Sequence, residues 1–180
     1  MKLPSSLASL PALRSVFALG LAAGSASAQT WNGGDGLWNT AANWTPALPV
    51  SGTATALTFE ASGITSYTAT NNIGPFTLNG LTVNNTGTGT VTLAGSATAN
   101  TLTFAGTNPA IHVSSGTAVL SGLMAGTATV TKTGVGTFIH DSNNTAFTGT
   151  LIVDAGSFVN RSTLVATLSG DNLHFFREPW

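Results

Sequence analysis

Few side chains of this chain could do acid–base chemistry, and they do not form a group. Asp141 and Asp154 are separated by a short stretch of chain and could approach each other on neighbouring faces of a fold, as the paired carboxylates of polysaccharide-degrading enzymes do. Each stands in a run typical of turns, Asp-Ser-Asn-Asn and Val-Asp-Ala-Gly. Lys132 and Arg161 are too isolated to suggest the base of a lyase. We therefore expect turn positions and no catalytic residue, and a degenerate polysaccharide-active protein is the alternative.

The histidines do not indicate a metal site or a catalytic triad. His112 alternates with apolar neighbours and has no carboxylate nearby in the sequence. His140 and Asp141 are consecutive, and consecutive residues of a strand point to opposite faces, so they form no dyad. His174 lies in an atypical tail. We expect surface histidines, no metal and no cofactor, and the absence of cysteine excludes thiol catalysis and cysteine zinc sites.

Three tryptophans near the start are the best candidates for a functional cluster: Trp31, Trp38 and Trp44. Aromatic faces can stack on sugar rings, with Asn and Thr binding the hydroxyl groups. They could instead close the end of a repetitive fold, which otherwise exposes its core and an unpaired strand edge. Their position favours the cap, and carbohydrate contact stays open. The run Asn32-Gly33-Gly34-Asp35-Gly36 resembles one copy of a calcium-binding repeat, but one copy predicts only a tight turn.

The chain has few charged residues, and this excludes some classes of binding partner. Residues 29–180 contain three basic and six acidic residues, a net charge of −3, and thirty threonines. No charged residue stands between Glu60 and Lys132. A chain with so few Lys and Arg residues has no positively charged surface that could bind phosphate groups. Nucleic acid and anionic membrane surfaces are therefore excluded as partners. After residue 28 no apolar run is long enough to span a bilayer.

Residues 1–28 have the three parts of a secretory signal peptide. Lys2 and Arg14 supply positive charge, an apolar run extends from Ser15 to Ala23, and Ala26-Ser27-Ala28 is a small-x-small cleavage site. The alternative is a short buried or membrane helix, but the run is too short to cross about 30 Å of hydrocarbon. We expect export by a Sec-type signal and a mature chain that begins at the next residue.

The rest of the chain alternates apolar residues with Thr, Ser or Asn in short runs separated by Gly or Asn, which predicts an all-β fold. A β-solenoid is favoured, and a β-sandwich is the alternative, with Asn79-Gly80 as a hairpin turn. Strands are expected at Ala56–Phe59, Ser66–Thr70, Phe76–Val83, Thr90–Leu93, Thr101–Phe104, Ile111–Val113, Thr117–Leu120, Thr127–Thr131, Gly136–Ile139, Thr150–Val153, Ser157–Val159 and Thr163–Leu168.

Two pairs of similar segments suggest the length of one coil. One pair consists of Leu81-Thr82-Val83 and Leu102-Thr103-Phe104, and the other consists of the segments that begin at Thr90 and Thr117. Each spacing suits a single turn of a solenoid. Coils of this size would give about six turns and a rod of about 30 Å.

Two segments resemble the autotransporter-associated β-strand repeat family. Lys132 to Ile139 follows its pattern of K-x-G-x-G-T, and Asn143 to Phe158 resembles its N-x-Y-x-G-x-T segment, with Phe147 in place of Tyr. Thr30 to Trp44 resembles the motif that follows the signal peptide in large exported proteins with such repeats. After Phe158 the next repeat does not appear.

This resemblance implies a right-handed parallel β-helix and a passenger-type structural or adhesive protein on the surface of a Gram-negative-type bacterium. Gly134, Gly136, Gly149 and Gly156 would then provide positive-φ corners. Surface glycans or other cell-surface proteins would be the partners, and we expect the chain to be the first part of a longer protein. The expected organisation is a signal peptide (1–28), a Trp-rich cap (29–55), a β-helix (56–159, with the repeat at 132–158) and an atypical tail (160–180).

Overall fold

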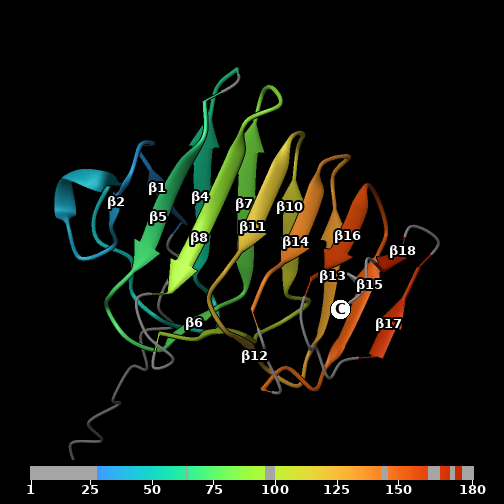
Figure 1. The fold of residues 1–180 in the computed structure, drawn as a ribbon. Helices are drawn as coiled ribbons and strands as arrows, with labels where there is room; N and C mark the ends of the chain where they lie inside the picture. Colours follow the sequence, from blue (N-terminus) through green and yellow to red (C-terminus); the bar gives the residue numbers. More distant parts are fainter. Residues whose placement is uncertain are drawn as a thin grey trace, which may run out of the picture.

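The protein is a β-solenoid, as the alternating sequence predicts. The computed structural model describes residues 28–63, 65–95, 100–142, 146–161, 167–170 and 173–175, without the side chains of the last three. The described chain winds through about five turns with parallel sheets. The colours in Figure 1 run from blue at one end to red at the other, so successive turns follow one another along a single axis. The β-sandwich alternative is wrong, and the predicted signal peptide lies outside the described residues.

Three sheets form the faces of the solenoid. Sheet A contains β1 (Ala28–Trp31), β3 (Trp44–Thr45), β4 (Ala56–Ala61), β7 (Gly80–Asn85), β10 (Ala110–Val113), β13 (Thr129–Thr133), β15 (Thr150–Val153) and β17 (Thr167–Ser169). Sheet B contains β2 (Gly36–Leu37), β5 (Tyr67–Asn71), β8 (Thr90–Gly95), β11 (Thr117–Leu120), β14 (Thr137–His140), β16 (Ser157–Asn160) and β18 (Leu173–Phe175). Sheet C contains β6 (Phe76–Leu78), β9 (Leu102–Phe104) and β12 (Met124–Ala125).

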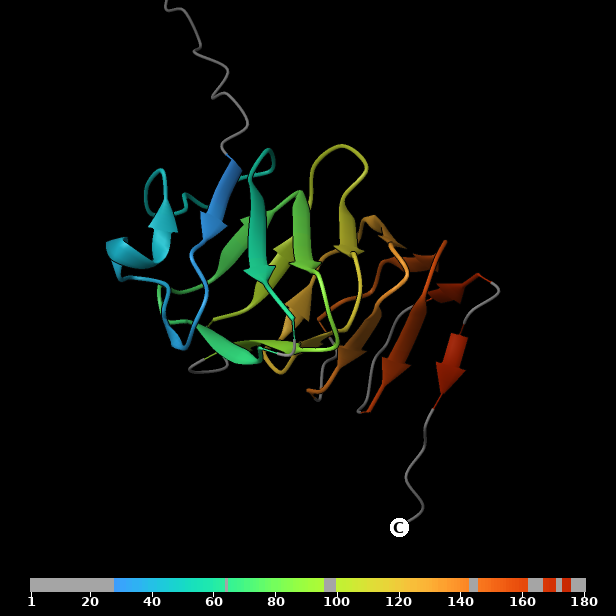
Figure 2. The same cartoon turned by 90° about the horizontal axis from the view of Figure 1, so that it is seen from above.

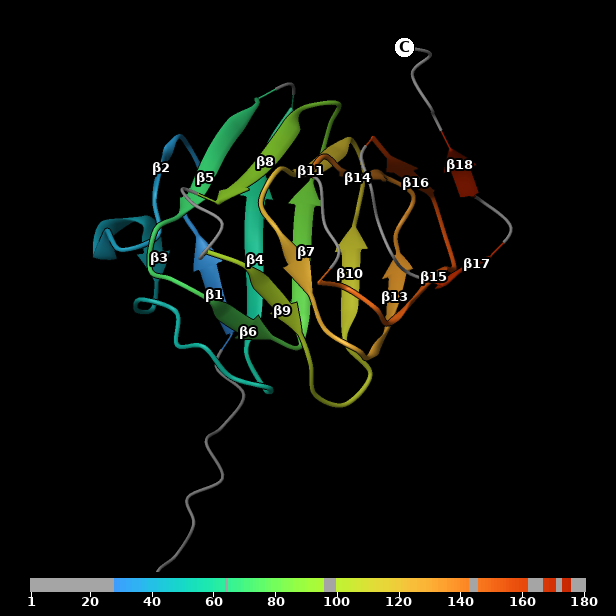
Figure 3. The same ribbon diagram turned by 60° about the horizontal axis from the view of Figure 1, so that its bottom comes forward.

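The turns that begin with β4, β7 and β10 visit sheets A, B and C in that order, and the later described turns alternate between strands of sheets A and B, so strands pair with their equivalents in the next turn. Figures 2 and 3 show this succession from above and from below. The exception among the described strands is β3, which pairs antiparallel to β1 at the first turn and follows the short 3-10 helix Ala41–Asn43. Within the part of the chain that the structure describes, no helix is long and apolar enough to span a membrane.

The core consists of inward residues stacked in columns. In sheet A one column contains Leu57, Leu81, Ile111, Lys132 and Val153, each in register with the next. All five are at most 2% exposed. Most residues between the inward positions are β-branched or small and face outward, which is why the strands alternate Thr with apolar residues. The one charged member of this column is a fully buried lysine.

The pairing of strands between turns shows which of the two predicted spacings is one turn of the solenoid. Thr90 pairs with Thr117 in sheet B, so the predicted spacing between these two residues is one turn. The prediction that the spacing between Leu81 and Leu102 is one turn is wrong, because these residues belong to different sheets. The number of residues in a turn varies. Leu81 pairs with Ile111 and Ile111 pairs with Lys132, and the turn from Leu81 to Ile111 is clearly longer than the turn from Ile111 to Lys132.

The expected strand Phe76–Val83 is two strands on two faces. Asn79 separates β6 from β7 and forms a corner, with its backbone N–H donating to Thr55 O at 2.8 Å. Its carbonyl accepts from Ala110 N at 2.9 Å in the next turn. The Asn-Gly pair that would form a hairpin in a sandwich therefore turns the chain onto a new sheet.

The glycines of the repeat are needed for two different reasons. Gly134 and Gly156 have φ values of 78° and 70°, as expected for corner glycines. Gly136 and Gly149 are not among the positive-φ residues, so that expectation is wrong for them. A Cβ on Gly136 would lie 2.6 Å from Val113 Cγ1, and one on Gly149 would collide with Ala128 O. Close backbone approach between turns excludes a side chain there.

We expect Gly134→Ala to destabilise the fold by about 2 to 4 kcal/mol, from backbone strain of about 1 to 3 kcal/mol and a clash with Val113 O. Gly34→Ala is the matched control, because Gly34 has a similar φ of 85° but nothing within 4 Å of an added Cβ. Urea midpoints measure the difference. Equal losses in both variants would show that the neighbouring turn does not restrict Gly134.

Candidate functional site

The three tryptophans lie in the core at the first turn. Trp31 and Trp38 are fully buried and Trp44 is 4% exposed. Their rings meet edge to face, with centroids 5.0 Å apart for Trp31 and Trp44 and 5.5 Å apart for Trp38 and Trp44. Phe59 and Phe76 of the second turn extend the cluster. A buried ring offers no face to a sugar, so this geometry argues against the carbohydrate-contact hypothesis for these residues.

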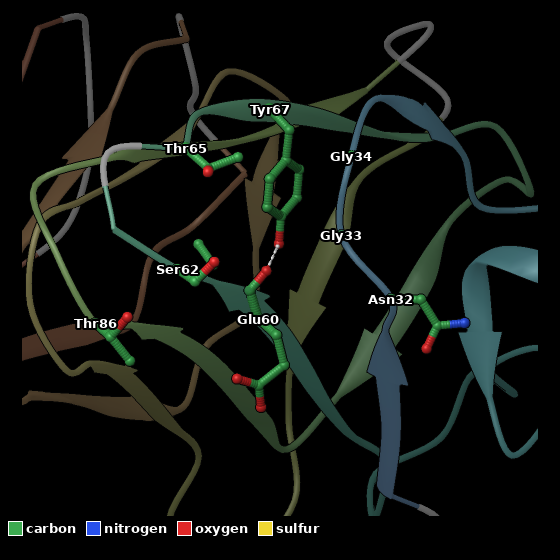
Figure 4. A pocket seen from close by; sticks show the side chains of 9 residues that line it. Asn32, Gly33, Gly34, Glu60, Ser62, Thr65, Tyr67 and Thr86 are labelled. Carbon is green, nitrogen blue, oxygen red and sulfur yellow. Dashed lines mark hydrogen bonds between the residues drawn. The ribbon is translucent and has the colours of Figure 1, made fainter.

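A pocket of about 380 Å³ with a mixed polar and apolar lining lies outside the core at the corner between sheets A and B. We call it the Glu60 pocket. It is built by three successive turns, with residues that follow β1, that run from the end of β4 to the start of β5, and that follow β7 (Asn32, Gly33, Gly34, Glu60, Ala61, Ser62, Thr65, Tyr67 and Thr86). In the view of Figure 4, Tyr67 and Glu60 stand in the middle, between the hydroxyl side chains and the two glycines.

Hydrogen bonds hold the walls of the Glu60 pocket in place. Tyr67 is 5% exposed and its hydroxyl donates to the backbone carbonyl of Glu60 at 2.8 Å. Burial, with a smaller contribution from the Glu60 carboxylate, raises the pKa of Tyr67 above its usual value, so the hydroxyl stays protonated. The Glu60 side chain is exposed, and its Oε2 accepts from Asn84 Nδ2 at 2.9 Å. The carboxylate is thus oriented by the neighbouring strand.

Lys132 is the most unusual polar group of the core. It is fully buried, and its ammonium group, which has three N–H donors, lies within hydrogen-bond distance of four backbone carbonyls. The Nζ–O distances are 3.0 Å to Thr133, 2.7 Å to Gly134, 2.7 Å to Gly136 and 2.8 Å to Ala155. Burial lowers the pKa of Lys132 to about 8, so the group is still mostly protonated at pH 7. The lysine links its own corner to the corner of the next turn.

His140 is buried, so the expectation of a surface histidine is wrong for this residue. It lies at the end of β14, where Nδ1 is 3.1 Å from Asn160 Oδ1 and Nε2 is 3.4 Å from Ser142 Oγ. His112 is half-buried between inward neighbours and lies 3.0 Å from Thr133 Oγ1. The side chain of His174 lies outside the described residues.

The buried imidazole predicts a loss of stability in mild acid. Desolvation lowers the pKa of His140, and the Asn160 hydrogen bond and Asp141 oppose this only in part. The unfolded chain binds a proton near pH 6.5, while the folded chain binds it only at a lower pH, so stability falls as the pH drops below about 6.5. We expect His140→Gln to remove this slope between pH 7.5 and 5.5 in thermal melts. An unchanged slope would assign the effect to other groups.

The two carboxylates that could suggest catalysis lie at different corners of the solenoid. Asp141 follows β14 of sheet B and Asp154 follows β15 of sheet A, as turn residues would. Asp141 instead lies 3.8 Å from the guanidinium of Arg161, with both side chains about half exposed. An exposed ion pair of this kind contributes little to the stability of the fold. Across the described ranges, no three His, Asp or Glu side chains are grouped as for a metal ion.

Sequence reasoning missed the Glu60 pocket, although one signal was present. The Asn-Gly-Gly-Asp-Gly run predicts a turn, and Gly33 and Gly34 indeed bend the chain with φ values of 87° and 85°. The same run forms one wall of the pocket. Glu60 and Tyr67, from the second turn, become its neighbours only through the stacking of turns.

The stacked turns and parallel sheets place the protein in the class of parallel β-solenoids. Among curated proteins the chain is similar to the "Adhesin BmaC autotransporter" of Brucella suis biovar 1 (strain 1330), with 34% identity over 146 residues. The match covers 77% of this chain but 4% of that relative's length. No family model matches the chain, and no solved structure matches it. A homologue is thus an autotransporter adhesin, while the resemblance to the repeat family stays a prediction.

Proposed function

We propose that this chain is a non-catalytic segment of an exported adhesin of the passenger type, displayed on the bacterial surface. The similarity to an autotransporter adhesin over most of the chain is the observation that carries this proposal. The parallel solenoid supports it, because stacked turns build a long surface from simple repeats. The relative is far longer, so its adhesive activity is extended to this chain as a proposal only.

The outer faces of the sheets are suited to binding without catalysis. In sheet B the outward residues Thr90, Thr117, Thr137 and Ser157 are in register across four turns. Neighbouring strands are about 4.8 Å apart, so these hydroxyl groups form a regular row. The row is uncharged and offers hydrogen bonds to surface glycans or to other cell-surface proteins. Neither the row nor the scattered carboxylates provide an activated nucleophile.

The remaining predictions fit the same proposal. A signal peptide at residues 1–28 would export the chain from a Gram-negative-type bacterium, either as a secreted protein or to the cell surface or outer membrane. Residues 29–55, with the tryptophan cluster, would cap the first turn, followed by the β-helix of residues 56–159 and the tail of residues 160–180. Burial of all three rings supports capping over sugar contact.

Adhesion of coated beads tests the proposed function. Beads carrying the protein should bind epithelial cells in greater number than beads carrying albumin, and soluble protein should compete. A parallel assay follows the release of reducing ends or unsaturated products from acidic polysaccharides. Equal binding of both kinds of bead would contradict adhesion. Turnover that Asp141→Asn or Asp154→Asn abolishes would contradict the non-catalytic assignment.

A further inference from the structure

We propose that the Glu60 pocket is a binding site for one neutral saccharide unit of a surface glycan. This inference rests on the proposed adhesive function and names the ligand class and the place where it binds. The pocket volume of about 380 Å³ lies within the range of about 300 to 1,000 Å³ that small-molecule sites occupy. Its walls come from three turns, so the pocket belongs to the solenoid and not to one loop.

The chemistry of the lining matches the hydroxyl groups of a sugar. Glu60 is exposed and anchored through Oε2 by Asn84, which leaves Oε1 free of hydrogen bonds from the described residues. That oxygen can accept a hydrogen bond from a ligand hydroxyl. Ser62 and Thr65 have exposed hydroxyl groups, which both donate and accept. The hydroxyl groups of a sugar can likewise both donate and accept hydrogen bonds.

Charge decides against other ligand classes. The lining contains a carboxylate and no cationic side chain, so phosphate, sulfate and acidic sugars would be repelled. One carboxylate is too few for a protein calcium site, which takes six to eight oxygen ligands, several of them carboxylates. The Tyr67 ring is 5% exposed, so it offers no open face to a cationic peptide. A neutral saccharide fits all three observations.

The pocket is also preorganised. The Tyr67 hydroxyl is fixed to the carbonyl of Glu60, and the indole N–H of Trp31 donates to Gly34 O at 3.1 Å. These bonds tie the second-turn wall and the glycine wall to buried aromatic rings. Because Gly33 and Gly34 have no side chains, the glycine wall stays open to a ligand. Little ordering would be required when a sugar binds.

Saturation-transfer NMR on the intact protein tests the site with the methyl glycosides of glucose, galactose, mannose and N-acetylglucosamine. We expect at least one to bind with a dissociation constant of about 1 mM, as a ligand of about twelve non-hydrogen atoms allows. Glu60→Ala should weaken that binding by at least about tenfold, and Thr65→Ala should weaken it less. Asp154→Ala removes an exposed carboxylate elsewhere and should leave binding unchanged. N-acetylneuraminic acid should not bind.

The outcomes separate this inference from the adhesive function. Binding of no neutral glycoside, or binding that Glu60→Ala leaves intact, overturns the saccharide site even if coated beads adhere to cells. Stronger binding of N-acetylneuraminic acid than of the neutral glycosides overturns it as well. Glycoside binding that depends on Glu60, combined with beads that do not adhere, supports the site and contradicts the adhesive function.

Discussion

Lys132→Met is expected to destabilise the protein by about 3 to 5 kcal/mol, because hydrogen bonds made by a charged group contribute about 1.5 to 3 kcal/mol each and the desolvation of the ammonium offsets part of that gain. The variant keeps a long apolar side chain in the column between Ile111 and Val153. It removes the donor for the carbonyls of Thr133, Gly134, Gly136 and Ala155. Backbone carbonyls cannot be substituted away, and a buried carbonyl left without a donor costs about 1 to 3 kcal/mol. The Gly136 carbonyl keeps a long bond from Ser157 N at 3.4 Å, and the other three belong to partly exposed residues, so the total stays below four full penalties.

Thermal melts should show this loss as a fall in the midpoint of about 10 °C, given about 2 to 4 °C per kcal/mol for a chain of this size. Arg161→Met removes an exposed cation, about half accessible, and should change stability by less than about 0.5 kcal/mol. Lys132→Arg keeps the charge but has a planar group, which does not fit a set of acceptors placed around an ammonium. A Lys132→Met protein as stable as the wild type would show that the ammonium is not required.

Trp38→Ala is expected to cost about 3 to 5 kcal/mol, the range measured for buried aromatic residues changed to Ala. The ring is fully buried, and its centroid lies 5.5 Å from Trp44, 5.8 Å from Phe59 and 5.5 Å from Phe76. Its loss leaves a cavity at the first turn, where one side of the core has no further turn of described chain to cover it. Urea unfolding and thermal melts measure the effect.

Leu37→Ala is the matched control for this prediction, since the neighbouring side chain is 46% exposed and should cost little. Glycoside binding gives a second readout. If the cluster is a structural cap, a folded Trp38→Phe variant should bind sugars as the wild type does. Loss of sugar binding in that variant, with stability retained, would restore the carbohydrate-contact hypothesis for the tryptophans.

Most of the secondary structure follows from the sequence alone. The alternation of Thr with apolar residues in segments such as Thr90–Leu93 and Thr117–Leu120 specifies strands with one buried and one open face. The positions of these strands are close to those observed, and the spacing between these two segments predicts one turn of the solenoid correctly. Local composition determines these features, because each strand repeats the same inward and outward pattern.

The pairing of strands could not be read from local patterns. Phe76 to Val83 alternates like a single strand, yet Asn79 divides it between two sheets because its backbone is bound by the turns on either side. The resemblance between Leu81 and Leu102 is misleading for the same reason. Any short β-strand has this pattern, so only stacking reveals which strands are equivalent.

The sequence by itself determined that this protein is a β-rich chain with few charges, with strands at given places and turns between them. Only the tertiary structure decided the environments of its polar groups. Lys132 is buried because carbonyls from two turns surround it, and the tryptophans are buried because Phe59 and Phe76 of the next turn cover them. The Glu60 pocket exists because residues that are distant in the sequence meet on adjacent turns. Stacking brings distant segments together, and a single sequence does not encode that contact in any local run.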